Sequence, residues 1–94
     1  MRPISDAWSA LLEALPEALP RARKRGAQGL GVRFWGAAME GSVWASPLPP
    51  DPRATLERWA RLFPEPEHLT LVAWGEGWEA TLATVELAEE VEVL

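Results

Sequence analysis

The spacing of apolar residues changes twice between a helical and a strand-like period, and this alternation restricts the fold more than any other feature. Between Trp8 and Leu19, apolar side chains recur three or four positions apart, which predicts one face of an amphipathic helix. Over residues 30–39 side chains instead alternate between two faces, as in a strand. The same change then recurs, with a helical stripe over residues 56–63 before strand-like runs at 69–74 and 78–85.

Residues at the segment ends indicate where each element begins and stops. Ser5 or Asp6 can cap the start of a first helix. This helix is expected to end at the basic cluster 21–25, which is followed by Gly26. Pro16, inside this helix, predicts either a kink or a fresh helix starting near Pro16 or Pro20.

The second helix has the clearest start signal, an N-cap aspartate followed by proline at Asp51-Pro52. Two hairpins are expected around it. We predict a tight turn at Glu40-Gly41 before a short strand 42–46, and a three-residue loop 75–77 between the later strands.

The chain is therefore expected to form a single small α+β domain over residues 1–94, in the order α-β-β-α-β-β. Antiparallel hairpins would form a sheet, and both helices would pack on one face of it. The glutamate-rich tail 89–94 can add a short fifth strand at one edge.

The chain has no cysteine, which excludes disulfides, thiolate nucleophiles and cysteine metal sites. A reducing cytoplasm suits such a chain, and no segment approaches the ~20 apolar residues of a membrane span. Abundant Arg and Glu, proline-rich loops and the absence of Asn resemble a thermophile's composition.

Six tryptophans dominate the apolar surface that the chain can present. Trp8 and Trp59 fall on the helix stripes and should pack against the sheet. The other four form the candidate interaction surface: Trp35, Trp44, Trp74 and Trp78. Over a three-residue loop, Trp74 and Trp78 would share one sheet face, and Trp35 and Trp44 would share a face with Arg33 and Ser42.

Charge is divided along the chain. Residues 1–61 carry nine Lys or Arg and six Asp or Glu, whereas residues 62–94 carry eight Glu and no Lys or Arg. A candidate basic patch consists of Arg21, Arg23, Lys24, Arg25 and Arg33. Nucleic-acid binding there is an alternative hypothesis, which the pI of about 4.8 opposes.

No set of residues predicts catalysis, a cofactor or a metal. His68 lies in a Pro-Glu-rich stretch and is expected to be a solvated loop residue. The carboxylate pairs Glu76 with Glu79 and Glu89 with Glu90 are expected to be surface charges rather than acid–base pairs. The glycines at 26, 29 and 31 precede a strand, whereas a phosphate loop leads into a helix.

Three hypotheses for function follow. The leading one is a small interaction or scaffold protein, homodimeric through a tryptophan-bearing sheet face or edge. The second is nucleic-acid binding through residues 21–25. The third is small-molecule binding at an aromatic and acidic site near Trp74 and Trp78.

Overall fold

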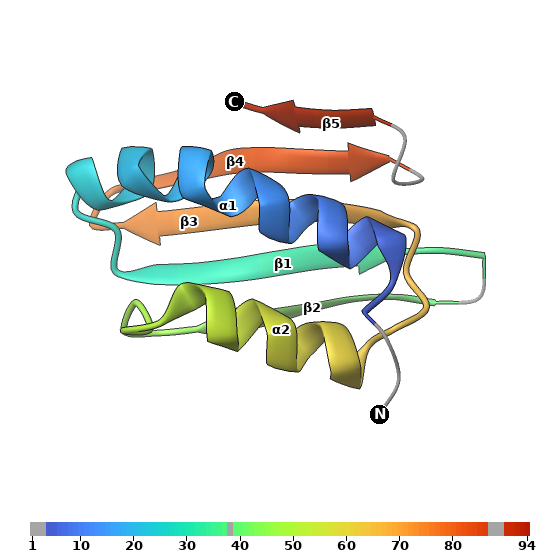
Figure 1. The fold of residues 1–94 in the computed structure, drawn as a ribbon. Coiled ribbons are helices and arrows are strands. Elements are labelled where there is room, and N and C mark those ends of the chain that lie inside the picture. Colours follow the sequence, from blue (N-terminus) through green and yellow to red (C-terminus); the bar gives the residue numbers. More distant parts are fainter. Residues whose placement is uncertain (1–3, 38, 87–89) are drawn as a thin grey trace.

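A computed structural model describes residues 4–37, 39–86 and 90–94 of the chain. The elements within these residues are α1 (Asp6–Lys24), β1 (Gly29–Trp35), β2 (Glu40–Ala45), α2 (Pro52–Leu62), β3 (His68–Gly75), β4 (Trp78–Glu86) and β5 (Glu90–Val93). The predicted α+β order is confirmed, and the tail supplies the fifth strand (Figure 1). Glu89, the first residue of the expected tail strand, lies outside the described residues.

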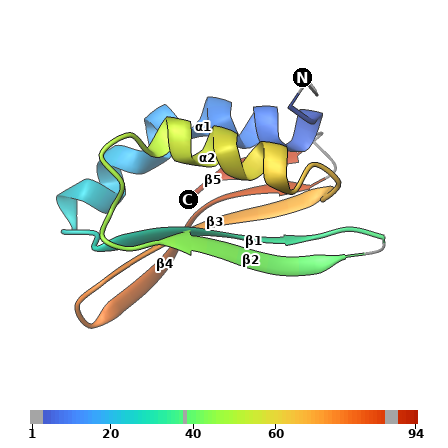
Figure 2. The ribbon, with the colours of Figure 1, turned by 90° about the horizontal axis from the view of Figure 1, so that it is seen from below.

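The strands form one antiparallel sheet in the order β2-β1-β3-β4-β5. Pairing of β1 with β3 joins the two hairpins, and β2 and β5 lie at the edges. Both helices pack on the same face of the sheet, α1 over β3 and β4 and α2 over β1 and β2 (Figures 1 and 2). The opposite face is covered by no element among the described residues.

Helix α1 begins where the sequence predicts, with the hydroxyl of Ser5 accepting a hydrogen bond from the backbone N–H of Trp8 at 3.3 Å. The prediction of a fresh helix at Pro16 or Pro20 is wrong, because α1 runs without interruption through both prolines. Both prolines are exposed, so water can bond the carbonyl groups that lose a helical partner.

The end of α1 has the geometry of a Schellman motif. Gly26 adopts a positive φ of 75°, and the N–H of Ala27 donates to the carbonyl of Ala22 at 3.0 Å. A positive φ favours glycine, which explains why the helix stops at this position. The chain then enters β1.

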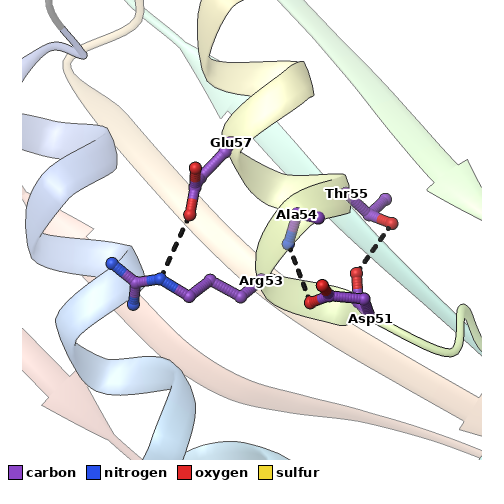
Figure 3. A network of polar contacts seen from close by, with 5 residues as sticks. All are labelled: Asp51, Arg53, Ala54, Thr55 and Glu57. Carbon is purple, nitrogen blue, oxygen red and sulfur yellow. Dashed lines mark hydrogen bonds and ion pairs between the residues drawn. The ribbon is translucent and has the colours of Figure 1, made fainter.

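Helix α2 begins at the predicted Asp51-Pro52 signal (Figure 3). The Asp51 carboxylate accepts a hydrogen bond from the N–H of Ala54 at 3.1 Å, and the Thr55 hydroxyl donates to the Asp51 carbonyl at 3.2 Å. Arg53 and Glu57, one turn apart, form an ion pair at 3.1 Å. These local contacts stabilise the first turns of the helix.

The core lies between the helices and the sheet. Trp8 is fully buried and Trp59 is 6% exposed, as the helix stripes predict. The indole N–H of Trp8 donates to the carbonyl of Phe63, just past α2, at 2.7 Å. The Phe63 ring stacks on Phe34 of β1 at a centroid distance of 5.0 Å. These contacts connect α1, the end of α2 and the sheet.

The first hairpin turns earlier than the sequence predicts. Trp35 pairs with Glu40, and the N–H of Gly36 bonds to the carbonyl of Met39 at 2.8 Å. Strand β1 therefore ends at Trp35, and Glu40 and Gly41 lie within β2. Alternation predicted a strand to residue 39, but Gly36 and Ala37 have little or no side chain to pack across the sheet. Ala38 itself lies outside the described residues.

Candidate functional site

The candidate site lies on the sheet face opposite the helices, here called the open face. Strand pairing places Arg33 and Trp35 of β1 on this face, while Leu30, Val32 and Phe34 point to the core. Residues paired with open-face positions lie on the same face. The open face comprises Gly29, Gly31, Arg33, Trp35, Glu40, Ser42, Trp44, His68, Thr70, Val72, Trp74, Glu79, Thr81, Thr84, Glu86 and Glu92.

The indole of Trp74, on the neighbouring strand β3, packs against two glycines of β1. A Cβ atom at Gly29 would overlap Cζ2 and Cε2 of the Trp74 indole. A Cβ at Gly31 would lie 3.4 Å from Cζ3 of Trp74, 3.2 Å from Cβ of Trp44 and 2.9 Å from the carbonyl oxygen of Val43. Glycine in a strand often marks a close approach of another group, and here that group is an indole.

A groove of about 340 Å³ lies above Gly31. Trp44 of β2 and Trp74 of β3 line it, together with Val72. Val72 is only 6% exposed although it lies on the open face, whereas Trp44 is 69% exposed. The groove thus has a buried apolar floor beside an indole that projects into solvent. Its volume lies in the lower part of the range of about 300–1,000 Å³ found for ligand sites.

An ion pair borders the same groove. A guanidinium nitrogen of Arg33 lies 2.8 Å from a carboxylate oxygen of Glu79. Since β3 separates β1 from β4, these two side chains cross above the middle strand. They are 61% and 57% exposed, so the pair contributes little to stability, about 0.2–1 kcal/mol.

At the other end of β1, Trp35 stacks on His68, its cross-strand partner. The rings are parallel, with centroids 5.2 Å apart. The prediction that His68 is a solvated loop residue is wrong, because it begins β3 and is half-buried. Its Nδ1 atom is buried without a hydrogen-bond partner among the described residues. Burial by the indole of Trp35 explains why this histidine is less solvated than expected.

Trp78 lies on the other side of the sheet from Trp74, so the prediction that they share a face is wrong. The hairpin closes over two residues, Glu76 and Gly77, and pairs Gly75 with Trp78. Gly77 has a φ of 77°, which a tight hairpin turn requires. Because side chains alternate along a strand, a one-residue difference in loop length reverses the face.

On the helix side, Trp78 packs against Gly75 and the end of α1. The guanidinium of Arg25 lies 4.3 Å from the centroid of the Trp78 ring. This is a cation–π contact. The third hypothesis therefore loses Trp78, and the aromatic groove that the structure contains is bordered by Trp44 instead.

The candidate basic patch does not form one surface. Arg21, Arg23, Lys24 and Arg25 are exposed around the end of α1. Arg33 lies on the open face, on the other side of the sheet. The Arg21 guanidinium also donates to the carbonyl of Leu94. Two of the four helix-end cations therefore have contacts within the chain.

The remaining candidates for chemistry stay apart or lie outside the description. Glu76 is in the hairpin turn, and Glu79 pairs with Arg33. Glu89 lies outside the described residues, as does the side chain of Glu90. Within the described ranges, no three His, Cys, Asp or Glu side chains come together as a metal site.

Alternation places Val72 on the face of Trp74, as the structure has it, but it wrongly puts Glu79 on the reverse face and misses the glycines as parts of the groove. The available signal was that Gly29 and Gly31 occupy one face of a strand, two positions apart. Bare glycines on a sheet face are commonly covered by an aromatic side chain of an adjacent strand. Pairing of β1 with β3 is needed to show that Trp74 is this side chain.

Comparisons with known proteins assign the chain to no family: no family model, no curated protein and no solved structure matches it. Among the described residues, no helix has the length and apolar character needed to cross a membrane.

Proposed function

We propose that the chain is a small protein–protein interaction module whose contact surface is the open face, centred on Trp44 and Trp74. The observation that carries this proposal is an indole 69% exposed beside a groove with a buried apolar floor. Tryptophan is enriched among residues that dominate binding energy at interfaces. The lack of cysteine is compatible with action in the cytoplasm.

The helix layer provides a weaker basis for function. The apolar stripes of both helices are buried against the sheet, so they are occupied within the fold. Arg25 and Arg21 contact Trp78 and Leu94, and Arg33 lies on the opposite face. Nucleic-acid binding through this cluster therefore has no supporting surface beyond the exposed cations themselves.

A homodimer is a second candidate, and the edge strand β2 favours it. Unpaired backbone groups on an edge strand can pair with another chain. Strand β2 contains no proline or lysine, and Glu40 at its start is its one charged residue. Strand β5 is shorter, with glutamates at two of its four positions, and is better protected. Dimerisation through β2 would leave the open face accessible.

Site-specific photo-crosslinking tests the main proposal. A benzoylphenylalanine at Ser42, an exposed open-face residue lining the groove, should give a discrete adduct in the cells that produce the protein. The matched position is Arg58, exposed on α2, which should give none. The adduct should disappear when Trp44→Ala is added. Equal adducts from both positions, or none from Ser42, would refute the proposal.

Sedimentation velocity between micromolar and millimolar concentration tests the homodimer. A dimer through the β2 edge should persist in Trp74→Ala, because β1 separates β3 from that edge, whereas one through the open face should dissociate. A monomer over the whole range would exclude both forms of homodimer. The crosslinked partner would then be a different protein.

A further inference from the structure

The open face has an unequal charge distribution. Four carboxylates lie on it, with Glu79 opposite Trp74, Glu40 opposite Trp35, and Glu86 and Glu92 opposite His68 and Thr84, and all four residues are exposed. Arg33 is the one cation among the open-face side chains that the structure describes. The face therefore has a net charge of −3 from these residues. A partner that supplies positive charge is thus complementary to this face.

A second copy of the chain does not fit this face in a symmetric, face-to-face arrangement. In a two-fold interface the same patch meets itself, so the carboxylates of the two copies would approach one another. Like charges placed together at an interface oppose association. Phosphate groups of nucleic acid would be repelled for the same reason.

The groove itself favours one type of cation. The indoles of Trp44 and Trp74 line the groove together with Glu79. A guanidinium is planar, stacks on aromatic rings and bonds carboxylates through two N–H groups at once, whereas an ammonium is a compact point charge. The chain already contains a guanidinium over an indole, Arg25 on Trp78 at 4.3 Å, and a guanidinium bonded to a carboxylate, Arg33 to Glu79 through one N–H at 2.8 Å.

We infer that the open face binds an arginine-bearing basic segment of a partner protein, with one guanidinium placed against Trp44 and Trp74 and bonded to Glu79. This inference rests on the proposed function and adds the chemistry of the partner. Glu79 is the attracting group, and Arg33 competes with the incoming guanidinium for it. The two residues of the ion pair thus have opposite effects on binding.

The test is a titration of the ¹⁵N-labelled full chain, followed by the indole N–H signals of its tryptophans. The probes are capped Gly-Arg-Ser repeat peptides, the same peptides with lysine, and the same peptides with citrulline, which is neutral and has nearly the shape of arginine. The arginine peptide should shift the signals of Trp44 and Trp74 and leave those of Trp8 and Trp59 in place. The citrulline peptide should shift none.

The variants give a result that a merely structural role would not produce. Glu79→Gln should weaken binding about two- to fivefold and Arg33→Gln should strengthen it by a similar factor, as expected for exposed charges. Trp44→Ala should weaken binding about three- to thirtyfold. Equal weakening by both charge variants would overturn the inference, as would lysine peptides that bind as tightly as arginine peptides.

Two further outcomes separate this inference from the proposed function. Shifts of the Trp44 and Trp74 signals on concentrating the chain alone would identify a second copy as the occupant. That would overturn the inference and leave the open face as a contact surface. Peptide binding that shifts neither signal and is unchanged in Trp44→Ala would overturn the inference, whereas the proposed function is decided separately by crosslinking at Ser42.

Discussion

Trp74 lies with its indole on Gly29, the residue opposite it on the neighbouring strand. The two positions belong to β3 and β1, which are the strands that join the two hairpins. The absence of a side chain at residue 29 lets the ring lie along the sheet and reach Gly31. The shape of the groove beside Trp44 therefore depends on the lack of a side chain at Gly29.

Gly29→Ala should displace the Trp74 ring, because the new Cβ would occupy its position. Overpacking of this kind typically costs about 1–3 kcal/mol. Urea unfolding should show the loss, and the Trp74 indole signal should move. The matched control is Gly36→Ala, whose Cβ would be 3.5 Å from its nearest neighbour and should be accommodated. Equal stability of the two variants would show that the ring is not held as described.

Trp8→Phe should lower the free energy of unfolding by about 1–3 kcal/mol, because the carbonyl of Phe63 would lose its hydrogen-bond donor within the core. For a domain of this size each kcal/mol corresponds to roughly 4–8 °C in Tm. Trp59→Phe is the control, because it makes the same change of ring at a position that is also buried. No hydrogen bond from the Trp59 indole is present among the described residues. A calorimetric Tm that falls equally in both variants would assign the loss to volume alone.

The element order was predictable because its signals are local. Apolar spacing, the N-caps at Ser5 and Asp51, and the glycine after α1 act within a few residues of where they stand. The strand order β2-β1-β3-β4-β5 was not predictable in this way. It depends on pairing of β1 with β3, whose partners are about forty positions apart in the sequence.

The candidate site was predicted in part. Trp35 and Trp44 lie on one face with Arg33 and Ser42, as alternation indicated. The sequence placed Trp78 on the wrong face, because that face depends on whether the hairpin loop has two residues or three. Gly75 and Gly77 are compatible with either loop length. The pairing of Arg33 with Glu79 was out of reach, since it crosses a strand that alternation does not position.

The ion pair of Arg33 and Glu79 should be nearly neutral for stability. Both side chains are more than half exposed, and pairs of this kind contribute about 0.2–1 kcal/mol. A double-mutant cycle with Arg33→Gln and Glu79→Gln, followed by urea unfolding, measures the coupling. A larger value would mean that the pair holds β1 and β4 together across β3. The binding effects expected for these variants would then reflect changes in the fold.

Trp44→Ala should leave stability almost unchanged, within about 0.5 kcal/mol, as for surface substitutions in general. In the same urea experiment Trp59→Ala should cost about 3–5 kcal/mol, because Trp59 fills the core between α2 and the sheet. The comparison uses one residue type on the two sides of the sheet. If Trp44→Ala lowers stability as much as Trp59→Ala, the exposed indole stabilises the fold. Its exposure would then not indicate a binding partner. If Trp44→Ala leaves stability unchanged, the exposed indole on this acidic face does not stabilise the fold. This is the result expected for a residue whose role is binding.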